Sequence, residues 1–205
     1  MNRKSHGENV YTTKAYDEVS WYREHLDTSL KMILGTGVSH DAAVIDVGGG
    51  SATLVDDLID QGFVDVTVLD ISGQALDVAK KRLGPRSSNV EWIEGDVTQT
   101  KLLENRFDVW HDRAVFHFLT DPEDRRKYVE LVRRAVKPSG HVIVASFGPG
   151  GPMKCSGLDV VRYSRDSMHD EFGDDFKLVD SLEETHHTPF GTDQEFMYCY
   201  CQVKK

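Results

Sequence analysis

The sequence predicts a three-layer α/β/α fold. Helices are expected to cover both faces of a doubly wound, mostly parallel seven-stranded sheet whose last strand pair is antiparallel. Three observations predict it. Between residues 43 and 147, apolar runs of strand length alternate with amphipathic stretches of helical spacing, which is the order of a parallel sheet. One run, 43–47, leads through three glycines into a helix. Two later runs, 176–184 and 196–203, follow each other without a helix between them and should pair antiparallel.

The first predicted strand and the glycines after it form the centre of the pattern. Residues 43–47 are apolar except for Asp46, as expected of a strand that is buried on both faces. The glycines at 48–50 lack the Cβ atoms that would keep a ligand away from the backbone. We expect Ser51 to cap a helix that ends near Gly62. Its inner face would consist of Leu54, Val55, Leu58 and Ile59.

The other elements follow in chain order. Strands are expected at 64–69, 89–94, 107–111 and 141–147, and helices at 73–83, 122–136 and 165–172. Ser72 and Asp121 are placed to cap two of these helices, and Pro122 suits a first helical position. Gly84 and the turn at 137–140 provide their ends.

The segment before the first strand has apolar residues three or four positions apart between 15 and 34, which predicts an amphipathic helix, broken near Thr28. Two interpretations are open. The helix packs on the sheet, or its first turn, with Tyr16, Trp21 and Tyr22, lies over a bound ligand as a lid.

Composition limits the class of protein. The chain has 205 residues, 39% hydrophobic and 28% charged, which suits one globular domain. No apolar run is long enough to span a membrane, and residues 1–19 lack the centre of a signal peptide, so we expect a cytoplasmic protein. We expect a monomer or homodimer. The net charge of −10 disfavours nucleic acid as a partner. Three cysteines are too few for a disulfide framework.

Acidic residues follow the predicted strands, where ligands bind in a doubly wound sheet. Asp70 is placed to accept two ribose hydroxyls, with Ile71 covering a base; alternatively Asp70 caps the next helix. Asp96 is placed to accept the exocyclic amine of adenine, and Gly95 would let the ring approach; alternatively Asp96 belongs to a turn. Val97 and His111 lie beside these positions.

Five segments carry a resemblance to a known family. Residues 44–52, 66–72, 93–97, 107–119 and 131–146 resemble the successive motifs of class I (seven-strand, Rossmann-like) S-adenosylmethionine (SAM) methyltransferases, in family order and at family spacing. Ala52 departs from the family, in which many relatives have glycine.

The resemblance implies a function and a division of the chain. It implies that SAM is the cofactor and that a methyl group moves to an N, O or S nucleophile of a small molecule or a protein lysine. Residues 1–205 would form one methyltransferase domain, with a helical lid at 1–40, a SAM-binding core at 41–147 and a substrate-side loop and strand pair at 148–205. The cofactor would be bound by Asp46, Gly48, Gly49, Gly50, Asp70, Ile71, Gly95, Asp96, Val97, His111 and Trp21.

The acceptor stays open. The segment 110–119 is similar both to the Asp-Lys-Gly segment of protein-lysine methyltransferases, with Arg113 and Ala114 in place of Lys and Gly, and to the histidine-bearing segment of small-molecule methyltransferases. For an amine acceptor, we expect Asp112 to orient the amine and His117 to accept its proton as the catalytic pair.

Other interpretations of these residues remain. Asp112 could cap the next turn, and His117 could pack between Phe116 and Phe118. A site for a thiophilic acceptor at Cys155, Cys199 and Cys201 is conceivable, and no metal site is expected.

A different class of function is also open: a non-catalytic nucleotide-binding or sensing module of the NAD type. Thr53 stands where the dinucleotide fingerprint has its third glycine, which counts against that module.

Overall fold

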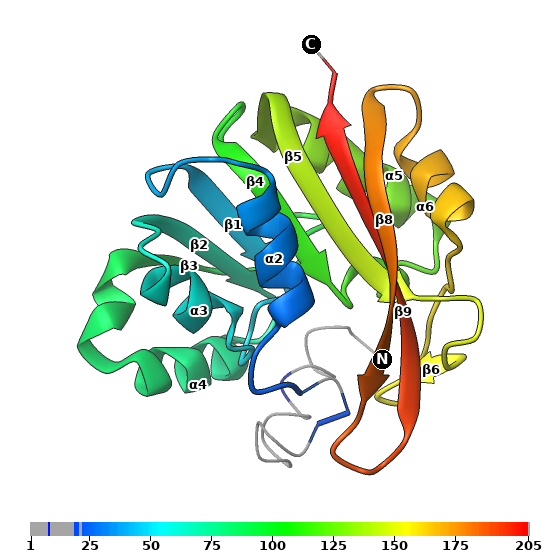
Figure 1. Ribbon diagram of the computed structural model, residues 1–205, viewed down its shortest axis with the longest axis horizontal. Coiled ribbons are helices and arrows are strands. Elements are labelled where there is room, and N and C mark those ends of the chain that lie inside the picture. The colour runs from blue at the N-terminus through cyan, green and yellow to red at the C-terminus, as the bar shows by residue number, and fades with distance from the viewer. Residues whose placement is uncertain (1–7, 9–18, 21, 205) are drawn as a thin grey trace.

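A computed structural model describes residues 8, 19, 20 and 22–204 (Figure 1). Its central sheet has seven strands in the order β3-β2-β1-β4-β5-β9-β8. They are β1 (Ala43–Val47), β2 (Asp65–Asp70), β3 (Val90–Glu94), β4 (Phe107–Arg113), β5 (Val136–Phe147), β8 (Phe176–His187) and β9 (Asp193–Val203). Strands β1 to β5 run parallel, and β9 pairs antiparallel with both β5 and β8. The predicted fold class is therefore confirmed.

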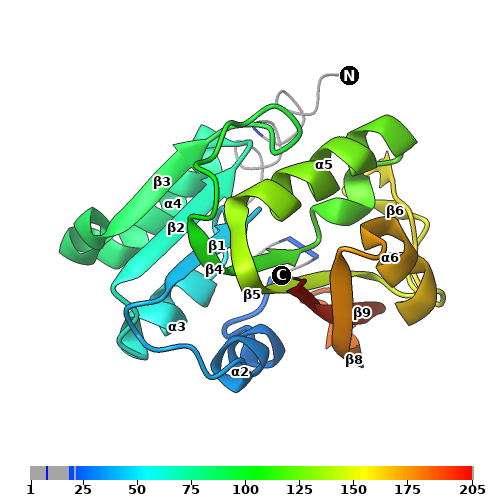
Figure 2. The ribbon, with the colours of Figure 1, turned by 90° about the horizontal axis from the view of Figure 1, so that it is seen from above.

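Helices cover both faces of this sheet. They are α2 (Asp27–Gly35), α3 (Leu54–Asp60), α4 (Gly73–Leu83), α5 (Pro122–Ala135) and α6 (Arg165–Phe172), with short 3-10 turns η1 (Gly84–Asn89) and η2 (Phe116–Phe118). Figure 2 shows α2 and α3 on one side of the sheet and α5 and α6 on the other. Within the described part of the chain, no helix has both the length and the apolar character needed to cross a membrane.

The two faces of the sheet carry separate apolar cores. Ile45 and Trp110 face the core under α5 and α6, whereas Val44 and Val109 face the core under α2, α3 and α4. Because side chains alternate along a strand, each residue of β1, and of β4 from Val109 on, is assigned to a face by its position; between Phe107 and Val109 the pairing is irregular. This alternation decides which polar side chains can meet on one face of the sheet.

The N-terminal helix is shorter than predicted. α2 begins at Asp27, and residues 22–26 are irregular, while 15–18 and Trp21 lie outside the described residues. The residue at its N-cap is Leu26, whose side chain makes no capping hydrogen bond. The expected break near Thr28 is thus close to the helix start.

The predicted cap of α3 is wrong. The helix begins at Leu54 with Thr53 in the cap position, and Ser51 stays in the preceding loop. The guanidinium of Arg82 binds the Ser51 carbonyl, which holds that residue outside the helix. By contrast, Ser72 and Asp121 cap α4 and α5 through their side chains, as predicted.

Two further differences concern turns. α5 ends at Ala135 rather than 136, because Val136 already pairs with Phe107, and the turn at 137–140 lies inside β5 where the register shifts. The short hairpin of β6 (Lys154–Cys155) and β7 (Leu158–Asp159) was not predicted.

A chain of hydrogen bonds crosses the core under α5. The Trp110 indole donates to the Tyr128 hydroxyl at 2.9 Å, and that hydroxyl donates to Asp112 Oδ2 at 2.7 Å. All three side chains are fully buried. Buried polar groups of this kind stabilise a fold only while each keeps its partner.

Replacing Tyr128 with Phe should therefore destabilise the protein, since it leaves the Trp110 N–H and one Asp112 oxygen buried without a partner. We expect a loss of about 2–4 kcal/mol in the free energy of unfolding, measured by urea denaturation. Tyr200→Phe is the matched control, because the Tyr200 hydroxyl bonds to half-buried His141 and its loss should cost less than about 1 kcal/mol. Equal stability of Tyr128→Phe and wild type would contradict a structural role for the hydrogen bonds among Trp110, Tyr128 and Asp112.

Candidate active site

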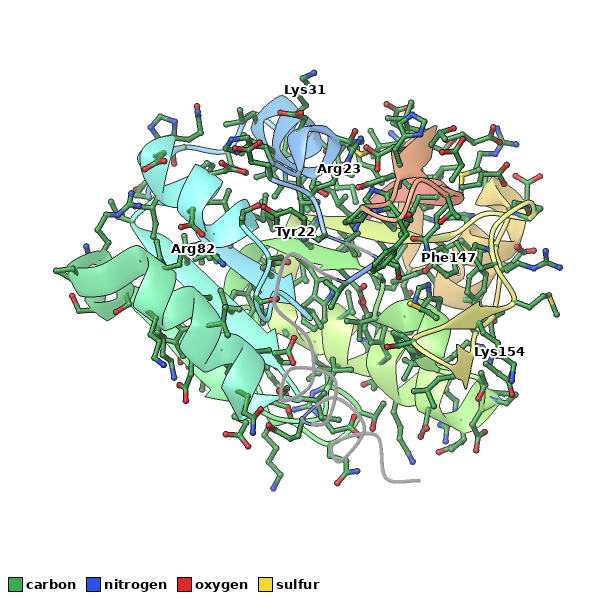
Figure 3. The ribbon with its side chains drawn as sticks, turned by 90° about the horizontal axis from the view of Figure 1, so that it is seen from below. Tyr22, Arg23, Lys31, Arg82, Phe147 and Lys154 are labelled. Atoms are coloured by element: carbon green, nitrogen blue, oxygen red, sulfur yellow. The ribbon has the colours of Figure 1, made fainter. Side chains whose placement is uncertain are left out.

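The carboxyl ends of the parallel strands form one edge of the sheet, at the bottom of Figure 1. At this edge a cavity lies against the glycine loop, and Figure 3 views the molecule from that side, with Tyr22 and Arg23 between Arg82 and Phe147. The cavity is lined by Val19, Tyr22, Arg23, Leu26, Asp46, Gly48, Gly49, Ser51, Ala52, His111 and Arg113. Four predicted cofactor residues therefore meet in one place: Asp46, Gly48, Gly49 and His111.

A buried pair of polar side chains forms the base of this cavity. Asp46 and His111 are register partners on β1 and β4, and Asp46 Oδ1 accepts a hydrogen bond from His111 Nδ1 at 2.7 Å. Asp46 is 3% exposed and His111 is 0% exposed. His111 Nε2 is buried without a hydrogen-bond partner among the described residues. With Nδ1 bonded to the carboxylate, Nε2 is the ring nitrogen that remains for a ligand, and His111 lines the cavity.

The glycines leave room for carboxylates. A Cβ on Gly49 would collide with the Asp46 side chain, and a Cβ on Gly50 would lie 2.6 Å from Asp70 Oδ2. Gly48 has a φ of +72° and a Cβ there would collide with Val115. The glycine loop can therefore pass close to both acidic side chains, which places them beside any ligand on the loop.

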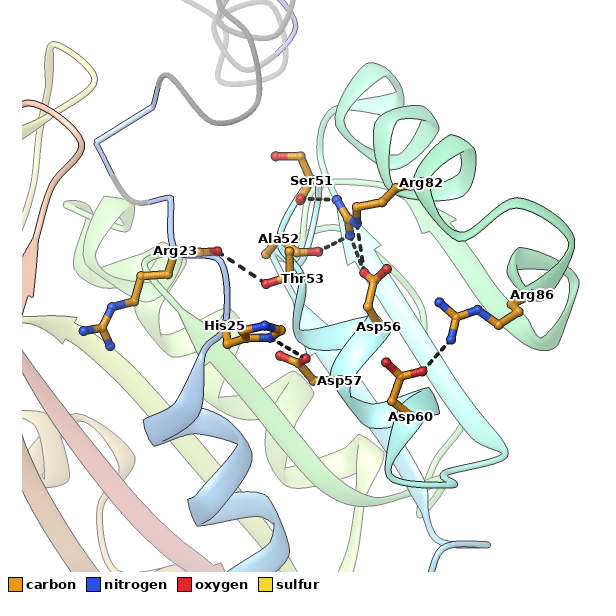
Figure 4. Close-up of polar contacts among 10 residues, drawn as sticks. All are labelled: Arg23, His25, Ser51, Ala52, Thr53, Asp56, Asp57, Asp60, Arg82 and Arg86. Carbon is orange, nitrogen blue, oxygen red and sulfur yellow. Dashed lines mark hydrogen bonds and ion pairs between the residues drawn. The ribbon is translucent and has the colours of Figure 1, made fainter.

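An arginine from α4 fixes the far end of the loop (Figure 4). Arg82 donates to the carbonyls of Ser51 and Ala52, each at 2.7 Å, and pairs with Asp56 at 2.6 Å. These are the last residues of the loop before α3, so the guanidinium joins the loop to two helices. No pattern in the sequence pointed to this contact.

The irregular segment 22–26 covers the cavity and is anchored at several points. The Thr53 hydroxyl donates to the Arg23 carbonyl at 3.4 Å, and His25 Nδ1 lies 2.8 Å from Asp57 Oδ1 (Figure 4). Tyr22, one of the three aromatic residues of the predicted lid, lines the cavity. The other two, Tyr16 and Trp21, fall outside the described residues.

Asp70 lies at the end of β2, beside Gly50. Burial raises its pKa to about 7, against a hydrogen bond from the Ser72 N–H at 2.8 Å that favours the charged form. The negative charges of Asp46 and Glu8 raise the pKa further. A carboxyl group that is costly to ionise and faces a loop without side chains suits a ligand with hydroxyl donors.

The residues predicted to bind adenine differ in their contacts and burial. Asp96 Oδ1 accepts from both the N–H and the hydroxyl of Thr98, at 2.8 and 2.7 Å, which is the turn role considered as its alternative. A Cβ on Gly95 would lie 2.5 Å from the Thr100 hydroxyl, so this glycine makes room for Thr100. Val97 is buried in the apolar core, and Ile71 is half-buried.

The two predicted catalytic residues lie elsewhere. Asp112 follows His111 on β4, so its side chain lies on the opposite face of the sheet. Its oxygens accept hydrogen bonds from the Tyr128 hydroxyl at 2.7 Å and from the Val115 N–H at 2.9 Å. Burial raises the pKa of Asp112 to about 6. These contacts favour the turn-capping alternative over the expected orienting role, because the carboxylate holds α5 and the turn after β4.

His117 is also fully buried, and neither of its ring nitrogens has a hydrogen-bond partner in the described part of the chain. Its ring lies 4.5 Å from the ring of Phe118 and 4.6 Å from that of Phe147. Burial, with the charge of Arg113, lowers the pKa of His117 to about 3. Such a histidine is a weak base near neutral pH, which argues against the predicted proton transfer.

A second polar cluster adjoins the cavity on the side of β9 and β8. Arg113 Nε donates to the Tyr198 hydroxyl at 3.2 Å, and the guanidinium lies 4.0 Å from Glu184 and 4.1 Å from the centre of the Phe196 ring. Glu184 also binds the Arg23 guanidinium. Sequence reasoning noted Arg113 but missed its partners, which come from the C-terminal strands.

The three cysteines do not converge. Cys199 and Cys201 lie on the face of α5 and α6, whereas Cys155 belongs to the other core. All three are free thiols, and the described residues contain no group of three metal-ligating side chains. A site shared by the three thiols is therefore not formed.

Comparisons with known proteins agree on one class. A family model described as a methyltransferase domain matches residues 44–140. EEF1A lysine methyltransferase 2 of Danio rerio is 27% identical over 137 residues, 63% of this chain and 58% of that protein. Demethylmenaquinone methyltransferase of Paenarthrobacter aurescens (strain TC1) is 31% identical over 104 residues, 51% of this chain and 38% of that protein. Each match spans less than two thirds of the relative.

Solved structures share the fold. N-methyltransferase NodS of Bradyrhizobium japonicum WM9, in complex with S-adenosyl-L-homocysteine (SAH), has a TM-score of 0.77 at 14% identity and full coverage of both chains. A SAM-dependent methyltransferase of Anabaena variabilis ATCC 29413 has a TM-score of 0.73 at 15% identity, covering 100% of this chain and 96% of that one. At these identities the likeness concerns the fold.

The raised pKa of Asp70 makes stability depend on pH. A carboxyl whose pKa is higher in the folded than in the unfolded state stabilises the fold at low pH, and this contribution is lost as pH rises from about 4 to about 7. Asp70→Asn should flatten this part of the stability curve and make the variant more stable than wild type at pH 8. Urea denaturation between pH 4 and 8 measures it. A wild-type stability that rises steadily over this range, with Asp70→Asn parallel to it, would show that the carboxyl is not buried as described.

Proposed function

The chain belongs to the class I SAM-dependent methyltransferases, and we propose that it transfers a methyl group from SAM to a nucleophile of a small molecule or of a protein lysine. The relatives named above act, by their names, on a protein lysine or on demethylmenaquinone, so both kinds of acceptor occur among similar proteins. Nothing in the comparisons supports the NAD-type module, and it is not proposed further.

The observation that carries the proposal is the Asp46–His111 pair beside the glycine loop. SAM has an ammonium group that donates hydrogen bonds, and His111 Nε2 is a buried acceptor without a partner among the described residues. Asp46 adds a negative charge next to it. A ligand ammonium would supply what this buried site lacks.

The remaining cofactor contacts follow the edge of the sheet. We assign the ribose hydroxyls to Asp70, and the adenine to Ile71, Gly95, Asp96 and Val97. When bound, SAM supplies a methyl group on a positively charged sulfur. The protein's own contribution is to orient the two reactants and to exclude water, with Tyr22 and Arg23 over the cavity. Trp21 stays a predicted cofactor contact.

The organisation and setting of the protein are part of the proposal. We retain one domain, with a lid at 1–40, a cofactor core at 41–147 and a substrate side at 148–205. Three free cysteines and a net charge of −10 support a cytoplasmic protein, monomeric or homodimeric, that acts on a small molecule or protein rather than on nucleic acid.

Binding of SAH tests the cofactor site directly. In isothermal titration calorimetry the wild type should bind SAH in the micromolar range, and NADH should give no signal. Asp70→Ala should weaken SAH at least tenfold, which corresponds to about 1.4 kcal/mol or more, because a buried acceptor for the ribose hydroxyls is removed.

Asp77→Ala is the matched control. Asp77 lies on α4 with an exposed side chain that pairs with Lys80, so its loss should leave SAH affinity within about twofold of wild type. Equal SAH affinity in wild type and Asp70→Ala would refute the assigned ribose site, and NADH binding in place of SAH would refute the proposed function.

A further inference from the structure

We propose that Glu184 on β8 is a positioning residue for the cofactor. Its carboxylate holds residues 22–26, the covering segment, against the cavity and thereby slows the release of SAM and SAH. The inference rests on the proposed function, because it concerns a cofactor bound at the glycine loop. It gives a role to the polar cluster around Glu184, which the predicted site did not include.

The covering segment forms part of the cavity wall. Tyr22, Arg23 and Leu26 line the cavity together with Gly48 and Gly49 of the glycine loop. A ligand on the glycine loop would therefore lie against the covering segment as well. The segment has to move away before such a ligand is released, so the contacts that hold it affect the rate of release.

One side of the covering segment is tied to α3. The Thr53 hydroxyl donates to the Arg23 carbonyl at 3.4 Å, and His25 Nδ1 lies 2.8 Å from Asp57 Oδ1. Figure 4 shows the guanidinium of Arg23 turned the other way, away from Thr53. The Arg23 side chain thus extends to a second anchor, on the C-terminal strands.

Glu184 is this second anchor, and each of its carboxylate oxygens has its own contacts. Oε1 accepts hydrogen bonds from the Arg23 guanidinium and, at 2.8 Å, from the Thr28 hydroxyl in the first turn of α2. Oε2 accepts a hydrogen bond from the Tyr198 hydroxyl at 3.3 Å and lies 4.0 Å from Arg113 Nη2. One carboxylate therefore joins the covering segment and α2 to β9 and the end of β4.

The hydrogen bonds of Tyr198 hold this carboxylate in place. The Tyr198 hydroxyl has one proton, which it donates to Glu184. The Arg113 Nε–H and the Ser29 hydroxyl therefore donate to Tyr198, each at 3.2 Å. Tyr198 and Ser29 are fully buried, whereas the Arg23 side chain is 28% exposed. The contact between Arg23 and Glu184 is thus the one that opens most readily.

The side chain of Glu184 is buried although β8 is an edge strand, where charged side chains are usually exposed. It is only 9% exposed, while Glu183 beside it is exposed. Their register partners on β9, Phe196 and Met197, belong to opposite cores, so Glu184 lies on the face of α2 and Glu183 on the face of α5 and α6. The alternation of β8 therefore directs this one carboxylate toward the covering segment.

Strand β8 also holds the chain just before the covering segment. His186 Nε2 donates to the Ser20 carbonyl at 2.8 Å, and the ring of His186 is buried. His186 and Glu184 are two positions apart and share a face of the strand. The chain is thus fixed to β8 at Ser20, Arg23 and Thr28, and the middle contact is the one next to the cavity.

The rate of SAH dissociation tests the anchor, measured by surface plasmon resonance on the immobilised protein. Glu184→Gln should raise this rate at least tenfold, because the amide lacks the negative charge that binds Arg23. Glu183→Gln is the matched control. It makes the same change of charge at the next position of β8, on the other face, and should stay within twofold of wild type.

Hydrogen exchange, followed by mass spectrometry without SAH, separates positioning from stability. In Glu184→Gln, exchange in a peptide spanning residues 22–30 should be at least tenfold faster than in wild type, while peptides from β1 and β4 exchange as in wild type.

A second variant covers the case in which Glu184→Gln does not fold, since removing one partner of a buried ion pair is strongly destabilising. Thr28→Val removes only the hydroxyl that donates to Oε1 and should raise the SAH dissociation rate at least threefold.

The outcomes distinguish the two claims. If the wild type does not bind SAH, the proposed function fails and the inference with it. If SAH binds but leaves Glu184→Gln and Thr28→Val at the wild-type rate, only the inference is overturned. Faster exchange throughout β1 and β4 in Glu184→Gln, or an equal effect of Glu183→Gln on SAH dissociation, would also overturn it, because Glu184 would then stabilise the fold rather than the covering segment.

Discussion

The hydrogen bond between Asp46 and His111 is the interaction on which the site depends. Two polar side chains are buried side by side on neighbouring strands, and each satisfies the other. The carboxylate takes the space over Gly49, so the loop can carry no side chain there. The same bond leaves His111 Nε2 without a partner among the described residues, and His111 lines the cavity. The glycine at position 49 and the unpartnered Nε2 therefore both depend on the register that brings Asp46 and His111 together.

Two groups of charged side chains lie at this edge of the sheet. Asp46 and Asp70 lie beside the glycine loop, which suits a cofactor with an ammonium and hydroxyl donors. On the side of β9 and β8, the guanidinium groups of Arg113 and Arg23 both contact Glu184. The buried surroundings strengthen the electrostatic interactions of both groups.

Features of the fold that depend on neighbouring residues could be predicted from the sequence. The strands, the caps at Ser72 and Asp121 and the acids at strand ends follow from alternation and spacing. Of the predicted residues, Asp46, Gly48 and Gly49 line the cavity. The contacts of Arg113 with Glu184 and Tyr198 were not predicted, because these residues arrive through the antiparallel pairing of β8 and β9, and Tyr198 lies 85 residues further along the chain. Their positions depend on register, which the sequence does not reveal. Because Asp112 alternates with His111 and Arg113, its side chain must face the opposite core, which disfavours its predicted catalytic role.

The protonation state of His111 in solution tests the central claim most directly. Nitrogen-15 NMR of histidine-labelled protein distinguishes the two ring nitrogens, and Asp46→Asn identifies the signals of His111 by their shift. The account predicts a proton on Nδ1 in the free protein and a marked shift of the Nε2 signal on addition of SAH. A proton on Nε2 with Nδ1 bare, or an Nε2 signal that SAH leaves unchanged, would contradict it.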